Sequence, residues 1–198
     1  MGNTGLVSVV DVKNVFPQMH RRRLYEWTKR GLIRRISKGY YIFTDMELNE
    51  PLLYFIGNKL HDPSYISLHS ALSWYGLIPE FVPQIASVST KKTCNLKTGI
   101  GNFAYFSVKR SLMFGYDLVP SKIQKYCFKM AFPEKALLDL LYLYPSIKNR
   151  EQFEELRLNS DIFNEKIRLE VLQSYLKLFA NKALTERVNN LLEYMKNA

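Results

Sequence analysis

Residues 21–41, RRRLYEWTKRGLIRRISKGYY, decide how the first part of the chain folds. An apolar face around Leu24 and Trp27 predicts an amphipathic helix over residues 19–30. Gly31 suits the left-handed backbone conformation that ends many helices. The stretch therefore predicts a helix with arginines at its start and lysine and arginine at its end.

The sequence on either side of this helix predicts two further elements. Apolar and aromatic residues over 32–42 predict a β-hairpin that bends at Gly39. Upstream, Ser8 can cap a short helix that Pro17 ends. A helix, a tight turn, a basic helix and a basic hairpin in this order are typical of a winged helix-turn-helix, so we expect residues 1–45 to form a DNA-binding domain.

The charge of the chain is concentrated in the same segment. Residues 1–45 hold nine Lys and Arg against three acidic residues, residues 46–145 hold ten against seven, and residues 146–198 hold nine against eight, for a net charge of +10. More than half of the excess lies in less than a quarter of the chain. Such a segment favours a polyanion as its partner.

Two groups of residues are candidates for contacts with double-stranded DNA. A helix in the major groove reads bases with the residues near its start, and flexible cations on a hairpin hold phosphates. The expected base-reading residues are Gln18, His20, Arg21, Arg22 and Tyr25. The expected phosphate-binding residues are Arg23, Lys29, Arg30, Arg34, Arg35 and Lys38. Two alternatives are a merely solvated basic surface and a basic helix that docks on an acidic protein.

The remainder, residues 46–198, predicts a second domain of mixed composition. Its patterns give the whole chain an α+β class: a small, mainly antiparallel sheet, a buried helix, and C-terminal helices after about residue 146. The expected helices cover residues 49–60 and 67–75 and begin again at Pro133. The expected strands cover residues 84–90, 103–108, 112–118 and 125–131. After Pro145 we expect three amphipathic helices, which pack on the sheet or present a face to a partner.

The sequence gives little reason to expect an enzyme. The acid-x-Lys triplet Asp11-Val12-Lys13 lies in the first predicted helix, and Glu134 and Asp139 are five residues apart on another, so neither suggests the clustered carboxylates of a nuclease. Cys94 and Cys127 stand far apart, which predicts reduced thiols and no metal. We expect no catalytic residues, no cofactor, no membrane span and a cytoplasmic location.

Four stretches resemble a known family, the AbiEi-type antitoxins and transcriptional regulators of bacterial type IV toxin-antitoxin and phage-defence systems. They are RRLYEWTKRGLIRRISKGYY (22–41), YISLHSAL (65–72), YGLIP (75–79) and FPEKALLD (132–139). The resemblance spans residues 7 to about 145 and leaves the segment after Pro145 without a counterpart.

The resemblance implies a two-domain protein. Its N-terminal winged helix would repress its own operon, and its C-terminal domain would act as the antitoxin of a nucleotidyltransferase-like toxin encoded next to it. The helix that usually precedes the first helix of such a domain has little room in residues 1–6.

Overall fold

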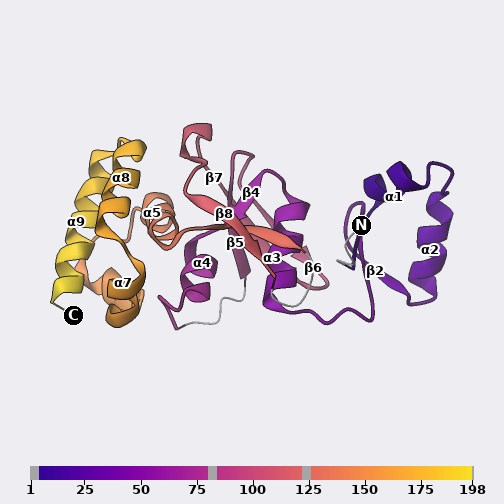
Figure 1. Cartoon of the computed structure of the whole chain (residues 1–198), viewed down its shortest axis with the longest axis horizontal. Helices are drawn as coiled ribbons and strands as arrows, with labels where there is room; N and C mark the ends of the chain where they lie inside the picture. Colours follow the sequence, from indigo (N-terminus) through magenta and orange to yellow (C-terminus); the bar gives the residue numbers. More distant parts are fainter. Residues whose placement is uncertain (1–4, 80–83, 122–125, 198) are drawn as a thin grey trace.

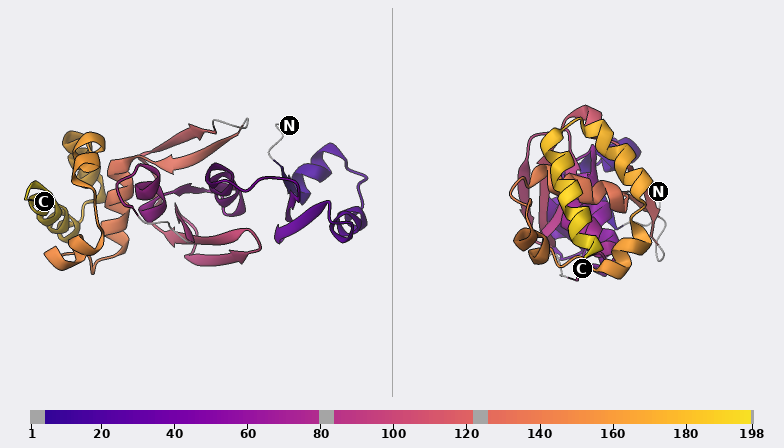
Figure 2. Two further views of the ribbon diagram at one scale, coloured as in Figure 1. Left: turned by 90° about the horizontal axis from the view of Figure 1, so that it is seen from below. Right: turned by 90° about the vertical axis from the view of Figure 1, so that its left-hand side faces the viewer.

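The computed structural model describes residues 5–79, 84–121 and 126–197, and the predicted α+β class is confirmed. The molecule is elongated (Figure 1). A small N-terminal unit, residues 5–43, lies at one end. A sheet with α3 (Glu50–Leu60), α4 (Leu68–Trp74) and α5 (Pro133–Leu143) lies in the middle, and the helices after Pro145 lie at the other end. The view from below shows the same succession (Figure 2, left).

The N-terminal unit contains two helices and a three-stranded antiparallel sheet with the strand order β1-β3-β2. Its elements are β1 (Leu6–Ser8), α1 (Val9–Val15), α2 (Arg21–Lys29), β2 (Ile33–Ser37) and β3 (Tyr40–Phe43). The predicted hairpin is confirmed, with Gly39 at φ +81°. The predicted cap is confirmed as well, because Ser8 Oγ accepts a hydrogen bond of 3.2 Å from Val10 N.

Two features of this unit differ from the prediction. The second helix begins at Arg21 rather than at residue 19, because His20 has extended backbone angles and takes the position before the helix. Strand β1 was not predicted. It has only three residues, too few to show an alternating pattern, and it forms because Leu6 to Ser8 pair with Tyr40 to Ile42 of β3.

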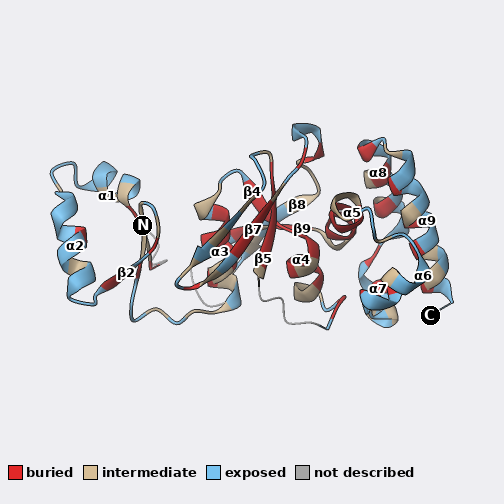
Figure 3. Ribbon diagram, turned by 180° about the vertical axis from the view of Figure 1, so that it is seen from behind, coloured by how far each residue is buried: buried red, intermediate tan, exposed pale blue. Residues whose placement is uncertain are grey.

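The N-terminal unit is joined to the rest of the molecule through its hairpin. Ile36 and Ile42 are buried and belong to the same hydrophobic cluster as Leu52 on α3. Leu24 and Ile33 are also buried but lie outside that cluster. Coloured by burial, α2 is exposed over most of its surface (Figure 3).

The middle of the molecule is built on a six-stranded sheet with the order β6-β7-β5-β4-β9-β8. Its strands are β4 (Ser64–Ile66), β5 (Gln84–Ser89), β6 (Cys94–Thr98), β7 (Gly101–Ser107), β8 (Tyr116–Pro120) and β9 (Cys127–Ala131). The helices packed with it are α3 (Glu50–Leu60), α4 (Leu68–Trp74) and α5 (Pro133–Leu143).

The sheet is mixed: antiparallel pairs are in the majority, as predicted, but two parallel pairs were not predicted. Pairs β4–β5, β6–β7 and β8–β9 are antiparallel, whereas β4–β9 and β5–β7 are parallel. The parallel pairs join strands that are separated by other elements in the sequence. Patterns along single strands carry no information on such pairings.

Several strand predictions are corrected. The strand expected at residues 112–118 begins only at Tyr116, since Gly115 with φ +69° separates it from a short 3₁₀ turn, Arg110–Leu112. The expected strand at 125–131 is present from Cys127, and its first residue lies outside the described part. Strands β4 and β6 were not predicted, because β4 has three residues and β6 is largely polar.

The described part after Pro145 contains four helices instead of three. They are α6 (Arg150–Glu155), α7 (Ser160–Lys166), α8 (Leu169–Phe179) and α9 (Lys182–Lys196). Three asparagines cap the starts of these helices: Asn149 for α6, Asn159 for α7 and Asn181 for α9. The side chain of each accepts a hydrogen bond from the backbone N–H three residues later. The additional helix arises because the chain turns at Arg157, which has φ +50° and lies between α6 and α7.

Helix α5 is the centre of the hydrophobic core, as its nearly uniform apolar surface predicts. Its residues Glu134 to Leu141 are all buried, and it contacts α4, α8 and α9 (Figure 3). No helix within the described residues is long and apolar enough to cross a membrane.

Candidate nucleic-acid interface

Helix α2 carries an unusual first turn. Arg21, Arg22 and Arg23 occupy it, all exposed, and it contains no acidic residue. His20 precedes the helix but its side chain makes no capping hydrogen bond. The three arginine charges are therefore added to the positive end of the helix dipole, where the first backbone N–H groups of the helix also lie. A bound anion stabilises such an arrangement.

The rest of α2 separates an inner side from an outer side. Leu24 is 3% exposed and holds the helix on the N-terminal unit, while Tyr25 is 69% exposed. Thr28 is exposed, and its hydroxyl donates to Leu24 O over 2.8 Å. Arg22 Nε lies 3.2 Å from Glu26 Oε1 in a solvent-exposed ion pair. Such exposed pairs contribute little to stability.

A groove lies where the turn between the two helices meets the start of α2. It has a volume of about 640 Å³ and is lined by Val15, Phe16, Pro17, Gln18, Met19, His20, Arg23 and Trp27. A neighbouring hollow adds Lys13 and Arg21. The predicted base-reading residues Gln18, His20 and Arg21 are thus brought together here. Arg22 and Tyr25 lie further along the exposed side of the same helix.

The cations after Thr28 differ in how accessible they are. Lys29 and Arg30 at the end of α2 are exposed, as are Arg35 and Lys38 on the hairpin. Arg35 Nε donates to Ser37 O over 3.2 Å. Arg34 is half-buried, and its Nε is shielded from solvent with no hydrogen-bond partner among the described residues. Of the predicted phosphate-binding residues, Arg34 is therefore the least available.

A buried polar cluster in the middle of the molecule was missed by the sequence analysis. Lys135 and Asp139, four residues apart on α5, form an ion pair with both side chains fully buried. Asp139 Oδ2 accepts hydrogen bonds from Tyr65 Oη at 2.9 Å and Ser67 Oγ at 2.8 Å. Lys135 Nζ also donates to Tyr65 Oη over 2.8 Å, so every member has a partner.

The surroundings of this cluster are aromatic. Lys135 Nζ lies 5.0 Å from the ring centres of Phe114 and Phe179, and Tyr116 stacks on Tyr65. Burial lowers the pKa of Lys135 and raises that of Asp139, and the opposite charge of the partner counteracts both shifts. This network links the sheet to α5, and the contact of Lys135 with Phe179 extends it to α8.

One signal in the sequence could have pointed to the cluster. Lysine and aspartate at positions i and i+4 share a helix face, and on an otherwise apolar helix such a pair is expected to be buried together. The same helix carries Glu134, whose buried carboxylate accepts hydrogen bonds of 3.1 Å from the backbone N and the Nε of Arg168. The two acids of α5 therefore have different partners: Glu134 pairs with Arg168, and Asp139 pairs with Lys135.

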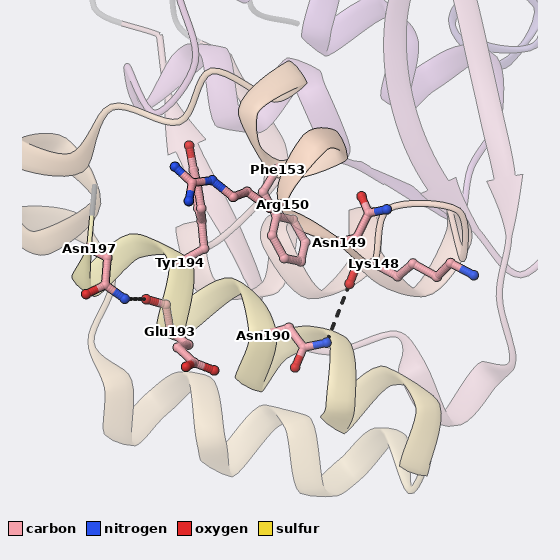
Figure 4. A pocket seen from close by; sticks show the side chains of 8 residues that line it. All are labelled: Lys148, Asn149, Arg150, Phe153, Asn190, Glu193, Tyr194 and Asn197. Carbon is pink, nitrogen blue, oxygen red and sulfur yellow. Dashed lines mark hydrogen bonds between the residues drawn. The ribbon is translucent and has the colours of Figure 1, made fainter.

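A second pocket lies between α6 and α9 (Figure 4). It measures about 580 Å³ and is lined by Lys148, Asn149, Arg150, Phe153, Asn190, Glu193, Tyr194 and Asn197. Its polar groups already bind within the chain: Asn149 caps α6, Asn190 Nδ2 donates to Lys148 O, and Arg150 pairs with Glu154. Of these contacts, the one between Asn190 and Lys148 connects α9 with the segment that leads into α6, and the other two are local to α6.

Among the described residues, no group of three or more His, Cys, Asp or Glu side chains could hold a metal ion. Cys94 and Cys127 are free thiols. No protein-family model matches the sequence, and no curated protein is similar to it.

Proposed function

We propose that the N-terminal unit is a winged helix-turn-helix that binds duplex DNA, and that the protein is a transcriptional autoregulator. In this proposal α2 enters the major groove and the β2–β3 hairpin is the wing. The antitoxin role against a nucleotidyltransferase-like toxin rests on the resemblance to AbiEi-type proteins and is part of the same proposal.

The observation that carries the proposal is the first turn of α2. Three exposed arginines at the positive end of a helix repel one another and the helix dipole. The first turn holds no acidic residue and no side-chain cap, and the contact of Glu26 with Arg22 is an exposed pair that offsets the repulsion only weakly. A phosphate backbone removes the repulsion and accepts hydrogen bonds from the free N–H groups. Arginines that extend beyond the phosphates can then read guanine edges in the groove.

The test is DNA binding by a triple variant, Arg21→Gln, Arg22→Gln and Arg23→Gln. The probe is duplex DNA from the region upstream of the reading frame that encodes the chain. We expect retention in a gel-shift assay to be lost, while the circular dichroism spectrum stays unchanged. A matched control, Lys177→Gln, Lys182→Gln and Lys196→Gln, removes the same charge from exposed positions of α8 and α9 and should bind like the wild type.

Equal binding by the arginine variant and the wild type would contradict the proposal. The antitoxin part has its own test, which is rescue of growth when the adjoining toxin gene is expressed together with this chain. Failure to rescue would remove that part and leave DNA binding untouched.

One observation favours a second function, a protein-interaction module. Phe16, which is 63% exposed, lines the groove described above together with Arg23, and Val10 on α1 is 66% exposed. Exposed apolar residues rimmed by cations suit an acidic protein surface such as that of a toxin. Capture of the purified toxin by the wild type but not by the triple arginine variant, with no DNA binding by the wild type at low salt, would favour this function over the first.

A further inference from the structure

Four segments that are distant in the sequence meet at one end of the six-stranded sheet. Strands β5 and β7 are parallel, so both finish there, and Val108 N donates to Ser89 O over 2.9 Å. Strand β4 starts there, because Ser64 pairs with Ser89. Strand β9 starts there as well, since it runs parallel to β4, and the end of α3 leads directly into β4.

Three of these segments bring exposed positive charge to this end: the residues after β5, the residues after β7, and the end of α3, which leads into β4. We use the name basic end for Lys59 at the end of α3, Lys91 and Lys92 after β5, and Lys109 and Arg110 after β7. None of the five forms an ion pair with another described residue. The nearby acid Asp62 is engaged by Lys129, 3.2 Å away.

Electrostatic effects between the segments agree with this convergence. The pKa of His61, which follows α3, is lowered first by burial and then by the charge of Lys91, which follows β5. Five unpaired cations so arranged repel one another. A site with that property is stabilised by a polyanion with closely spaced charges.

The basic end also lies next to the N-terminal unit. Tyr40 of β3 packs against the main hydrophobic core, and its pKa is raised by burial and by the charges of Asp11 and Asp62. Asp62 belongs to the same end of the sheet as Lys59. The N-terminal unit and the sheet follow one another along the molecule (Figures 1 and 2), and the effect of Asp62 on Tyr40 places this end of the sheet on the side of the N-terminal unit.

We propose that the basic end binds the phosphate backbone of the duplex held by α2, so that the DNA footprint extends beyond the N-terminal unit onto the sheet. This inference rests on the proposed function and adds a second contact surface to it. Cations at strand ends contact phosphates without reading bases, so the contribution is to affinity and salt dependence rather than to sequence preference.

The test uses the full chain and a variant with Lys91→Gln, Lys92→Gln, Lys109→Gln and Arg110→Gln. Its matched control is Lys148→Gln, Lys177→Gln, Lys182→Gln and Lys196→Gln, which lowers the net charge equally at exposed positions just before α6 and on α8 and α9. Binding to a mixed-sequence duplex of about 40 base pairs is measured by fluorescence anisotropy between about 50 and 300 mM salt.

We expect the slope of log affinity against log salt to fall by about 3 to 4 in the basic-end variant, at about 0.9 per lost phosphate contact, and to change little in the control. On a duplex of about 12 base pairs, roughly one helical turn, the variant and the wild type should bind alike because the DNA no longer reaches the sheet.

Three outcomes would overturn the inference. They are an unchanged slope, a slope reduced equally in the control, and an equal loss of affinity on the short duplex. In each of these the wild type still binds DNA and the triple arginine variant does not, so the proposed function stands. Absence of binding by the wild type at low salt contradicts the proposed function itself.

Discussion

Lys135 and Asp139 form an ion pair on α5 in which neither side chain is exposed to solvent. The pair is completed by Tyr65 and Ser67 from the sheet side, more than 70 residues earlier in the chain. Because the interior cannot solvate a charge, each partner depends on the other to remain ionised.

Asp139→Ala should therefore destabilise the protein strongly. It leaves the ammonium group of Lys135 buried without its counterion, which costs about 3–5 kcal/mol of unfolding free energy in comparable pairs. Urea unfolding measures the loss. Glu26→Ala, which breaks the exposed pair with Arg22, is the control and should cost less than about 0.5 kcal/mol. A loss below about 1 kcal/mol for Asp139→Ala would show that the pair is not sealed from water.

Tyr75 should make stability depend on alkaline pH. Burial and the charge of Glu134 raise its pKa to about 12, and its hydroxyl donates to Ala131 O over 3.0 Å. A folded-state pKa above the unfolded value of about 10 gives stability that is present below pH 10 and lost as the pH rises toward 12.

Tyr75→Phe isolates this contribution from those of the other buried tyrosines. Near pH 8 the variant should be less stable than the wild type by about 1 kcal/mol, the usual value for one lost hydrogen bond. That difference should shrink between pH 10 and pH 12, as followed by urea unfolding at each pH. A difference that stays constant over this range would mean that Tyr75 titrates alike in both states.

Leu24→Ala should release α2 without unfolding the rest of the molecule. Leu24 is the buried residue of that helix, and it lies outside the main hydrophobic cluster. Truncation of a buried leucine costs about 2–5 kcal/mol, which is more than a nine-residue helix can lose. Hydrogen exchange should become fast in α2 and stay slow in α5. Equal acceleration in both helices would show that they unfold together.

Arg21→Ala and Lys38→Ala should weaken DNA binding in different ways. Arg21 lies at the start of α2, where base contacts are expected, so its loss should cost about 1–3 kcal/mol and reduce the preference for the operator over other sequences. Lys38 lies beside the bend of the hairpin, so its loss should weaken binding to all sequences and lower the salt slope by about 1. Competition binding against an unrelated duplex distinguishes the two, and a reversed pattern would exchange their assigned roles.

The sequence predicted elements that are encoded locally. Leu24 and Trp27 at helical spacing, Ser8 before α1 and Gly39 at the bend each act within a few residues, and the helices and hairpin appear where these signals lie. The end of α6 at Glu155 was missed, because nothing in the residue type of Arg157, which follows with a positive φ, requires that conformation.

Long-range features could not be predicted in the same way. The contact between Tyr65 and Asp139 joins residues 74 positions apart, and the parallel pairing of β5 with β7 depends on the path of the intervening chain. The basic end is of the same kind. Lys91 and Lys109 are ordinary surface lysines in the sequence, and only the strand order brings them to one end of the sheet.

The hydrophobic cluster that includes Ile36 and Ile42 of the hairpin as well as Leu52 of α3 has a consequence for unfolding. A core shared across both parts of a chain makes them melt as one cooperative unit, so calorimetry should show a single major transition rather than two. Helix α2, attached outside that core, would be the exception. Its local opening would precede the main transition, and a ligand bound to it would raise the temperature of that early step first.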